Sequence, residues 1–101
     1  MADQLKLKIL WFENFLGISV DQITLNQQYA LTAYYFWPRT EAWEQLKSEL
    51  DSKPWLEQKE KVKILNFTTD VIDCWGEKRN LKSLEEVKNK FFEAQFIDIQ
   101  N

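Results

Sequence analysis

The sequence contains no histidine, one cysteine, two glycines and two prolines among its 101 residues. Without histidine, every mechanism that uses an imidazole as a base or as a metal ligand is excluded. Cys74 alone forms neither an internal disulfide nor a thiolate zinc cluster. Gly17 and Gly76 are too far apart for a phosphate-binding loop or a dinucleotide fingerprint. We therefore expect no enzyme activity, no cofactor, no bound metal and no small-molecule substrate.

Long hydrophobic runs are also absent. The longest, such as residues 9–12 and 34–38, fall far short of the ~20 residues that span a bilayer. The first six residues are charged and polar, which is typical of neither a signal peptide nor a transit peptide. We expect a protein with no membrane partner that is made in the compartment where it works.

The composition is that of a folded domain: 45% of the residues are hydrophobic, 15% are aromatic, and the formal net charge is -3. At this length a single domain over residues 1–101 is expected. Alternation of apolar and polar residues predicts a β-hairpin over 5–24, with Gly17 in its turn at positive φ. Residues 26–28 are predicted to form a loop, and residues 31–37 a third strand that Pro38 ends at a sheet edge.

Helical spacing dominates the remainder. Thr40 is predicted to cap a helix that starts at Glu41, and a second helix is expected over about residues 56–75 with Gly76 past its end. Its buried stripe is expected to hold these residues: Val62, Ile64, Leu65, Val71, Ile72 and Trp75. Ser83 opens a third helix with Leu84, Val87 and Phe91 buried, and residues 96–99 form a short added strand. The prediction is an α+β fold, an N-terminal hairpin or meander followed by three helices.

Two features invite a catalytic interpretation. Asp70 and Asp73 are three residues apart on one helix, but they belong to a continuous polar stripe, which favours a solvated face over an acid–base pair. Cys74 lies near the C-terminal end of a predicted helix, whereas a reactive thiol favours a helix N-terminus or a cationic neighbour. We interpret it as a small buried hydrophobic residue.

Cations are the candidates for nucleic-acid contact. Lys61 points nearly opposite to Lys59 and Lys63 on the helix, so that run contains two aligned lysines, not three. Neighbouring glutamates nearly cancel the remaining basic residues, and charge alone predicts weak independent binding to RNA.

Five tryptophans are unusual in so short a chain. Trp43 and Trp75 lie on apolar helix stripes and Trp11 lies on a strand face, which predicts core positions. Trp37 and Trp55 each adjoin a proline, and two interpretations stay open for them. They fill the core of a small domain, or they contact a partner through an exposed ring.

Several segments resemble one family in the same order along the chain. Residues 34–39, Tyr-Tyr-Phe-Trp-Pro-Arg, are followed by Ala42-Trp43-Glu44 and by Lys53-Pro54-Trp55. Over roughly residues 7–75 the chain resembles the plastid-specific small-subunit ribosomal protein 3 family of chloroplasts and cyanobacteria. Ala33 departs from it, standing where the family usually has a glutamate. Residues 76–101 carry no recognised pattern and are treated as a C-terminal extension.

The resemblance implies a structural component of the small ribosomal subunit that supports translation in a plastid stroma or a cyanobacterial cytoplasm. Its partners would be small-subunit ribosomal RNA and neighbouring ribosomal proteins. The candidate RNA contacts are Arg39, Lys78, Arg79 and Lys82, and the candidate protein contacts are Trp37 and Trp55. The alternative is a stand-alone interaction module or translation-associated factor that uses an aromatic anchor around the two tryptophans.

Overall fold

The first two strands form the predicted hairpin. A computed structural model describes residues 4–77 and 84–97, in which β1 (Gln4–Trp11) pairs antiparallel with β2 (Leu16–Ile23). The connection is closed by a 3.1 Å hydrogen bond from the N–H of Phe12 to the carbonyl of Phe15. All but the last residue of β2 are buried, so β2 is the central strand of the fold.

Gly17 has a different role from the predicted one. It lies inside β2 and does not have a positive φ. A Cβ at this position would lie 3.0 Å from Cβ of Leu10 and 3.0 Å from Cε1 of Phe36. Glycine is therefore favoured here because two neighbouring side chains approach the strand closely. The prediction of a turn glycine was wrong.

Two short strands replace the single strand predicted over residues 31–37. β3 (Gln28–Ala30) and β4 (Tyr35–Trp37) both pair antiparallel with β2. Gln28 thus begins a strand, although the sequence predicted a loop there. β4 ends immediately before Pro38, at the sheet edge, as expected.

A β-bulge separates the two short strands. The carbonyl of Val20 accepts hydrogen bonds from the N–H groups of both Leu31 (2.9 Å) and Thr32 (3.1 Å). The N–H of Val20 donates to the side-chain oxygen of Thr32 at 3.0 Å. Leu31 and Thr32 therefore both oppose Val20, which interrupts the regular hydrogen-bond ladder between the strands. The Thr32 hydroxyl supplies the acceptor for the Val20 N–H that the backbone does not offer here.

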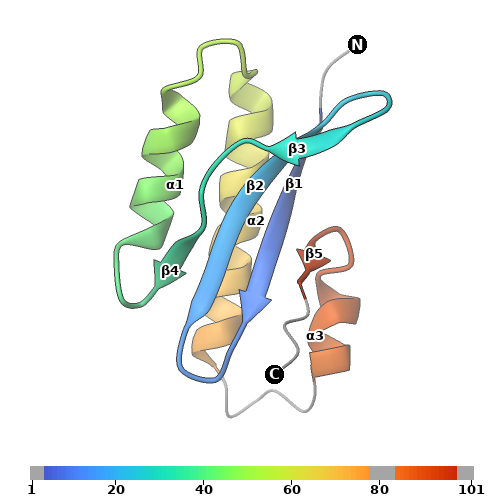
Figure 1. Cartoon of the computed structure of the whole chain (residues 1–101). Helices are drawn as coiled ribbons and strands as arrows, with labels where there is room; N and C mark the ends of the chain where they lie inside the picture. Colours follow the sequence, from blue (N-terminus) through green and yellow to red (C-terminus); the bar gives the residue numbers. More distant parts are fainter. Residues whose placement is uncertain (1–3, 78–83, 98–101) are drawn as a thin grey trace.

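A short fifth strand completes the sheet on the other side. β5 (Gln95–Phe96) runs parallel to β1 and pairs with Lys8 and Ile9, which confirms a short C-terminal strand. The strand order is β3-β2-β1-β5, with β4 also on β2. Figure 1 shows the long hairpin at the centre, with β4 on the side of α1 and β5 on the side of α3.

Three helices follow the strands as predicted. They are α1 (Ala42–Asp51), α2 (Gln58–Gly76) and α3 (Leu84–Lys90). In Figure 1, α1 and α2 lie together behind the sheet, and α3 lies beside β5. The architecture is therefore α+β, as the sequence predicted.

The helix details correct several predictions. Helix α1 begins at Ala42 after Glu41, with no side-chain cap, because the Thr40 hydroxyl instead hydrogen-bonds to the carbonyl of Phe36 at 2.9 Å. Val62 and Leu84, both expected in the core, are 45% and 42% exposed. Both side chains are therefore largely exposed to solvent and are not part of the core. Ser83, the predicted cap of α3, lies outside the described residues.

The core lies between the sheet and the two longer helices. It is built from one face of the hairpin, two leucines of α1 and the inner stripe of α2: Leu7, Ile9, Leu16, Ile18, Val20, Leu46, Leu50, Ile64, Leu65, Val71 and Trp75. The indole N–H of Trp75 donates to the carbonyl of Phe12 at 2.8 Å, and that of Trp43 donates to the carbonyl of Leu65 at 3.2 Å. The last turn of α2 is thereby held against the β1–β2 connection.

Candidate functional site

Arg39 lies on an aromatic surface at one end of the sheet. Its guanidinium carbon is 5.8 Å from the centroid of the Phe15 ring. Phe15 in turn contacts Phe12 (4.5 Å between centroids) and Phe36 (5.7 Å). We call these four residues the Arg39 surface. It joins residues from the β1–β2 connection with residues in and just after β4.

The charge of Arg39 is available to a ligand. The residue is exposed, and it makes no ion pair within the part of the chain that the structure describes. A guanidinium offers five N–H donors in one plane, which suits phosphate oxygens. The surface therefore presents a cation to solvent beside half-buried aromatic rings.

The other three predicted RNA contacts, Lys78, Arg79 and Lys82, lie outside the described residues. The end of α2, which precedes them in the chain, is described by the structure. Trp75 contacts the carbonyl of Phe12, so the end of α2 lies at the same end of the molecule as the Arg39 surface.

The two candidate protein contacts are not brought together. Trp37 is half-buried and packs against the core, whereas the Trp55 ring is 63% exposed. Trp37 lies before the start of α1 and Trp55 after its end. A helix of 10 residues separates such positions by about 15 Å. One continuous anchor made of both rings does not exist in this fold, and each remains a separate candidate.

Ion pairs and hydrogen bonds along α1 serve the fold. Glu49 accepts hydrogen bonds from Lys53 (3.1 Å) and from the Tyr35 hydroxyl (3.0 Å), and together these contacts lower the pKa of its carboxyl. Burial, and then the bond to Glu49, raise the pKa of Tyr35. These contacts attach β4 to α1.

The charged residues of α2 lie on two faces of the helix, and Lys61 lies on the inner one. It is buried and its ammonium lies 3.8 Å from Asp51 of α1, so it points away from the outer face of α2, as its spacing predicted. The outer face carries exposed polar residues throughout: Lys59, Lys63, Asn66, Asp70, Asp73 and Glu77. This confirms the solvated stripe, and both Asp70 and Asp73 are exposed to solvent.

Cys74 is half-buried against the core, as expected of a small hydrophobic residue. No group of three potential metal ligands occurs among residues 4–77 and 84–97. No helix in that part of the chain is long and apolar enough to cross a membrane.

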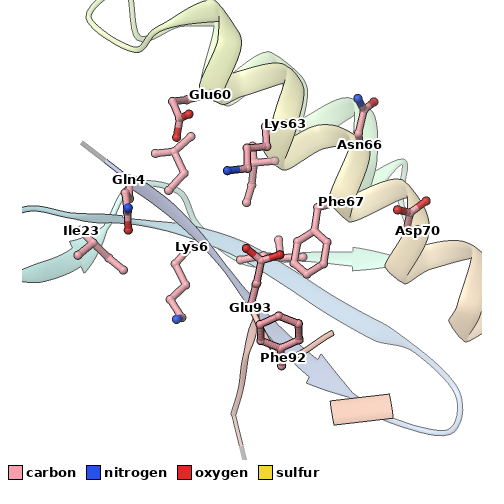
Figure 2. A pocket seen from close by; sticks show the side chains of 13 residues that line it. Gln4, Lys6, Ile23, Glu60, Lys63, Asn66, Phe67, Asp70, Phe92 and Glu93 are labelled. Carbon is pink, nitrogen blue, oxygen red and sulfur yellow. The ribbon is translucent and has the colours of Figure 1, made fainter. Parts of the chain in front are cut away.

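A cavity that the sequence did not predict lies between β1 and α2. Its volume is about 750 Å³, and Phe92, whose side chain is 78% exposed, stands at its rim. Figure 2 shows Glu60 and Lys63 reaching from the helix toward the strand, with Glu93 on the other side. The polar spacing on α2 was visible in the sequence, but nothing in it indicated that this face lies opposite a strand edge.

Comparison with known proteins places the chain in a family. The family model described as plastid and cyanobacterial ribosomal protein (PSRP-3 / Ycf65) matches residues 31–78, which run from the bulge through β4, α1 and α2. Related chains align over almost the whole length, as given below, and the chain belongs to this family.

Three relatives illustrate the match. The chain is 51% identical over 90 residues to "Small ribosomal subunit protein cS23" of Gracilaria tenuistipitata var. liui, covering 89% of this chain and 91% of the relative. It is 46% identical over 92 residues to the protein of the same name from Mesostigma viride, covering 91% and 75%. It is 43% identical over 93 residues to "Probable small ribosomal subunit protein cS23" of Synechococcus sp. (strain JA-3-3Ab), covering 92% and 89%.

Proposed function

We propose that this chain is a structural component of the small ribosomal subunit of a plastid or a cyanobacterium, with no enzyme activity. The observation that carries the proposal is the 51% identity over 90 residues to a relative named as a small ribosomal subunit protein. The chain would act in the plastid stroma or the cyanobacterial cytoplasm, where it would support translation by holding neighbouring parts of the subunit together.

The proposed RNA contact is the Arg39 surface together with Lys78, Arg79 and Lys82. Arg39 is supported by its exposure and by its ring contact with Phe15, which leave its donors free to bind phosphate. The three other cations follow α2, whose last turn adjoins the same surface. With a net charge of -3, the contact with RNA has to be local.

Contacts with proteins would supply the remaining affinity. The Trp55 ring is exposed between α1 and α2, with the ammonium of Lys53 5.9 Å from its centroid. An exposed indole in a turn between two helices is the kind of side chain that fills a pocket on a partner. Trp37 would contribute only through its exposed edge.

The test measures how salt weakens association. Small subunits depleted of the chain would be mixed with wild-type protein or with the Arg39→Ala/Lys78→Ala/Arg79→Ala/Lys82→Ala variant. Four lost phosphate contacts should reduce the slope of log K against log[salt] by about 3, and Arg39→Ala alone by about 1. The control Lys59→Ala removes an exposed lysine of α2 and should leave the slope unchanged. An unchanged slope in the fourfold variant would reject the RNA contact.

The alternative function is a stand-alone interaction module, and the exposed Trp55 ring is the observation that favours it. Under this alternative the chain would not follow the small subunit through a sucrose gradient, and Trp55→Ala would abolish its binding to a free protein partner. Under the main proposal, Trp55→Ala weakens association with the subunit and leaves the salt slope intact.

A further inference from the structure

The outer edge of β1 is open along half its length. β5 pairs with Lys8 and Ile9 only, and within the described residues nothing pairs with the four preceding positions on that side. The carbonyl of Ile9 accepts a 2.9 Å hydrogen bond from the N–H of Ile97 and so points outward. Backbone groups two residues apart point the same way, which directs the N–H and C=O of Leu5 to this edge. The edge therefore offers hydrogen bonds to another strand.

The open edge forms one wall of the cavity described above. Helix α2 forms the opposite wall, with Ile64 and Phe67 on the cavity side, and Leu5 and Leu7 contribute the apolar side chains of the strand. Phe92 and Glu93, which precede β5, close the third side (Figure 2). We call this space the β1–α2 groove. It is wide enough for side chains and has backbone groups along one wall, which is the form of a site for an added strand.

The charges of the groove are unpaired and have an excess of one negative charge. Three carboxylates and two ammonium groups line it: Glu60, Asp70, Glu93, Lys6 and Lys63. None of the five makes an ion pair within the described residues, although Lys8 and Asp21, elsewhere on the same hairpin, pair at 2.9 Å. In Figure 2, Lys6 extends away from α2, whereas Glu60 and Lys63 extend from α2 toward the strand and Glu93 lies on the other side of the cavity. An occupant with an excess of cations would match this lining.

We propose that the β1–α2 groove binds an extended, basic segment of another small-subunit protein, which adds as a short strand to the free edge of β1. Four residues of open edge correspond to about 13 Å of extended chain. Alternate side chains of the segment would lie against Phe67 and Phe92, and its cations would contact Glu60 and Glu93. The place of the groove in a ribosomal subunit depends on the function proposed above, while the strand addition does not.

Photocrosslinking within the intact subunit tests the proposal. The chain with p-benzoylphenylalanine in place of Phe92 would be incorporated into small subunits, irradiated and analysed by mass spectrometry. We expect a crosslink to another small-subunit protein, in a segment with more Lys and Arg than Asp and Glu. The same amino acid in place of Val62, which is exposed on α2 but does not line the groove, should not give this crosslink.

Other outcomes would overturn the proposal. A crosslink from position 92 to ribosomal RNA, to a second copy of the chain or to an acidic segment would reject the basic strand. The absence of any crosslink while the chain still sediments with the subunit would reject the groove as an interface. If the chain does not sediment with the subunit at all, it is the proposed function that fails, so the two failures are distinguishable.

Charge reversal provides an independent test. Glu60→Lys/Glu93→Lys should weaken association with depleted subunits by about tenfold or more, because like charges would then face each other across the groove. Asp73→Lys/Glu77→Lys makes the same change in net charge on exposed residues outside the groove and should alter association less than about twofold. Equal effects of the two variants would contradict the proposal.

Discussion

The two outer edges of the central hairpin differ in how much of their length is paired with other strands. The outer side of β2 pairs with both β3 and β4, and the Thr32 side chain bridges the bulge between them. The outer side of β1 pairs with β5 over two residues only. An unpaired strand edge is a template for another chain, and proteins usually cover it. We infer that the paired edge of β2 stabilises the fold and that the open edge of β1 binds a partner.

Among the substitutions considered, Gly17→Ala should destabilise the paired edge of β2 most. The added Cβ would lie 3.0 Å from atoms of Leu10 and Phe36 and would push β4 away from β2. We expect a loss of about 1–3 kcal/mol in the free energy of unfolding, measured with urea. Gly76→Ala is the matched control, because a Cβ there meets nothing within 4 Å and alanine favours the helix. Equal destabilisation by the two variants would mean that crowding is not why Gly17 is needed.

Thr32→Val should weaken the same side by a smaller amount. The change keeps the shape of the side chain but removes the acceptor of the Val20 N–H, which leaves a buried donor unpaired. The expected cost is about 1 kcal/mol, at the lower end of the range for a buried donor that loses its acceptor. Thr24→Val, at a site where the hydroxyl contact is exposed and 3.4 Å long, should change stability by less than about 0.5 kcal/mol. A neutral Thr32→Val would show that the side chain does not complete the ladder.

The attachment of β4 to α1 should depend on pH. Since the pKa of Glu49 is lowered in the folded chain from its ordinary value of 4.5, the carboxylate stabilises the fold above that pH. This contribution is lost as the pH falls through the lowered pKa. The exposed position of the pair keeps the effect below about 1 kcal/mol. Unfolding of wild type and Glu49→Gln, compared at pH 7 and at pH 3, should give curves that differ at pH 7 and converge at pH 3. A constant difference would contradict this prediction.

Hydrogen exchange of the free protein should show the open side directly, without any loss of stability. The N–H of Leu5 points to the free edge and that of Lys6 to β2, since successive backbone groups alternate. We expect the Leu5 amide to exchange at least about tenfold faster than the Lys6 amide by NMR. Equal protection of the two amides would show that the edge is already covered.

Much of the fold was predictable because it depends on local patterns. Alternation predicted the hairpin, and helical spacing with Gly76 predicted the long helix within two residues at its start and one at its end. The predictions were wrong where tertiary contacts, and not local sequence, determine the structure. Gly17 is favoured by the close approach of side chains from two other segments. The 31–37 region is divided by a bulge that depends on the contact of Thr32 with Val20. No local pattern contains that information.

The candidate site was predictable in part. The sequence identified Arg39, since it directly follows an aromatic run and Pro38, but the ring that it contacts, Phe15, comes from a distant connection. The β1–α2 groove was not predictable, because it exists only where β5 stops pairing and α2 faces the exposed edge. Trp37 and Trp55 were grouped by their prolines, and only the fold shows that α1 separates them.

The most direct test of the central claim is fractionation of a native lysate on a sucrose gradient, before and after a high-salt wash, with quantification of this chain against other small-subunit proteins. The account predicts one copy per small subunit, retained in part after the wash, because contacts with proteins supplement those of Arg39. Migration of the chain only at the top of the gradient in low salt would contradict the account and favour a free interaction module.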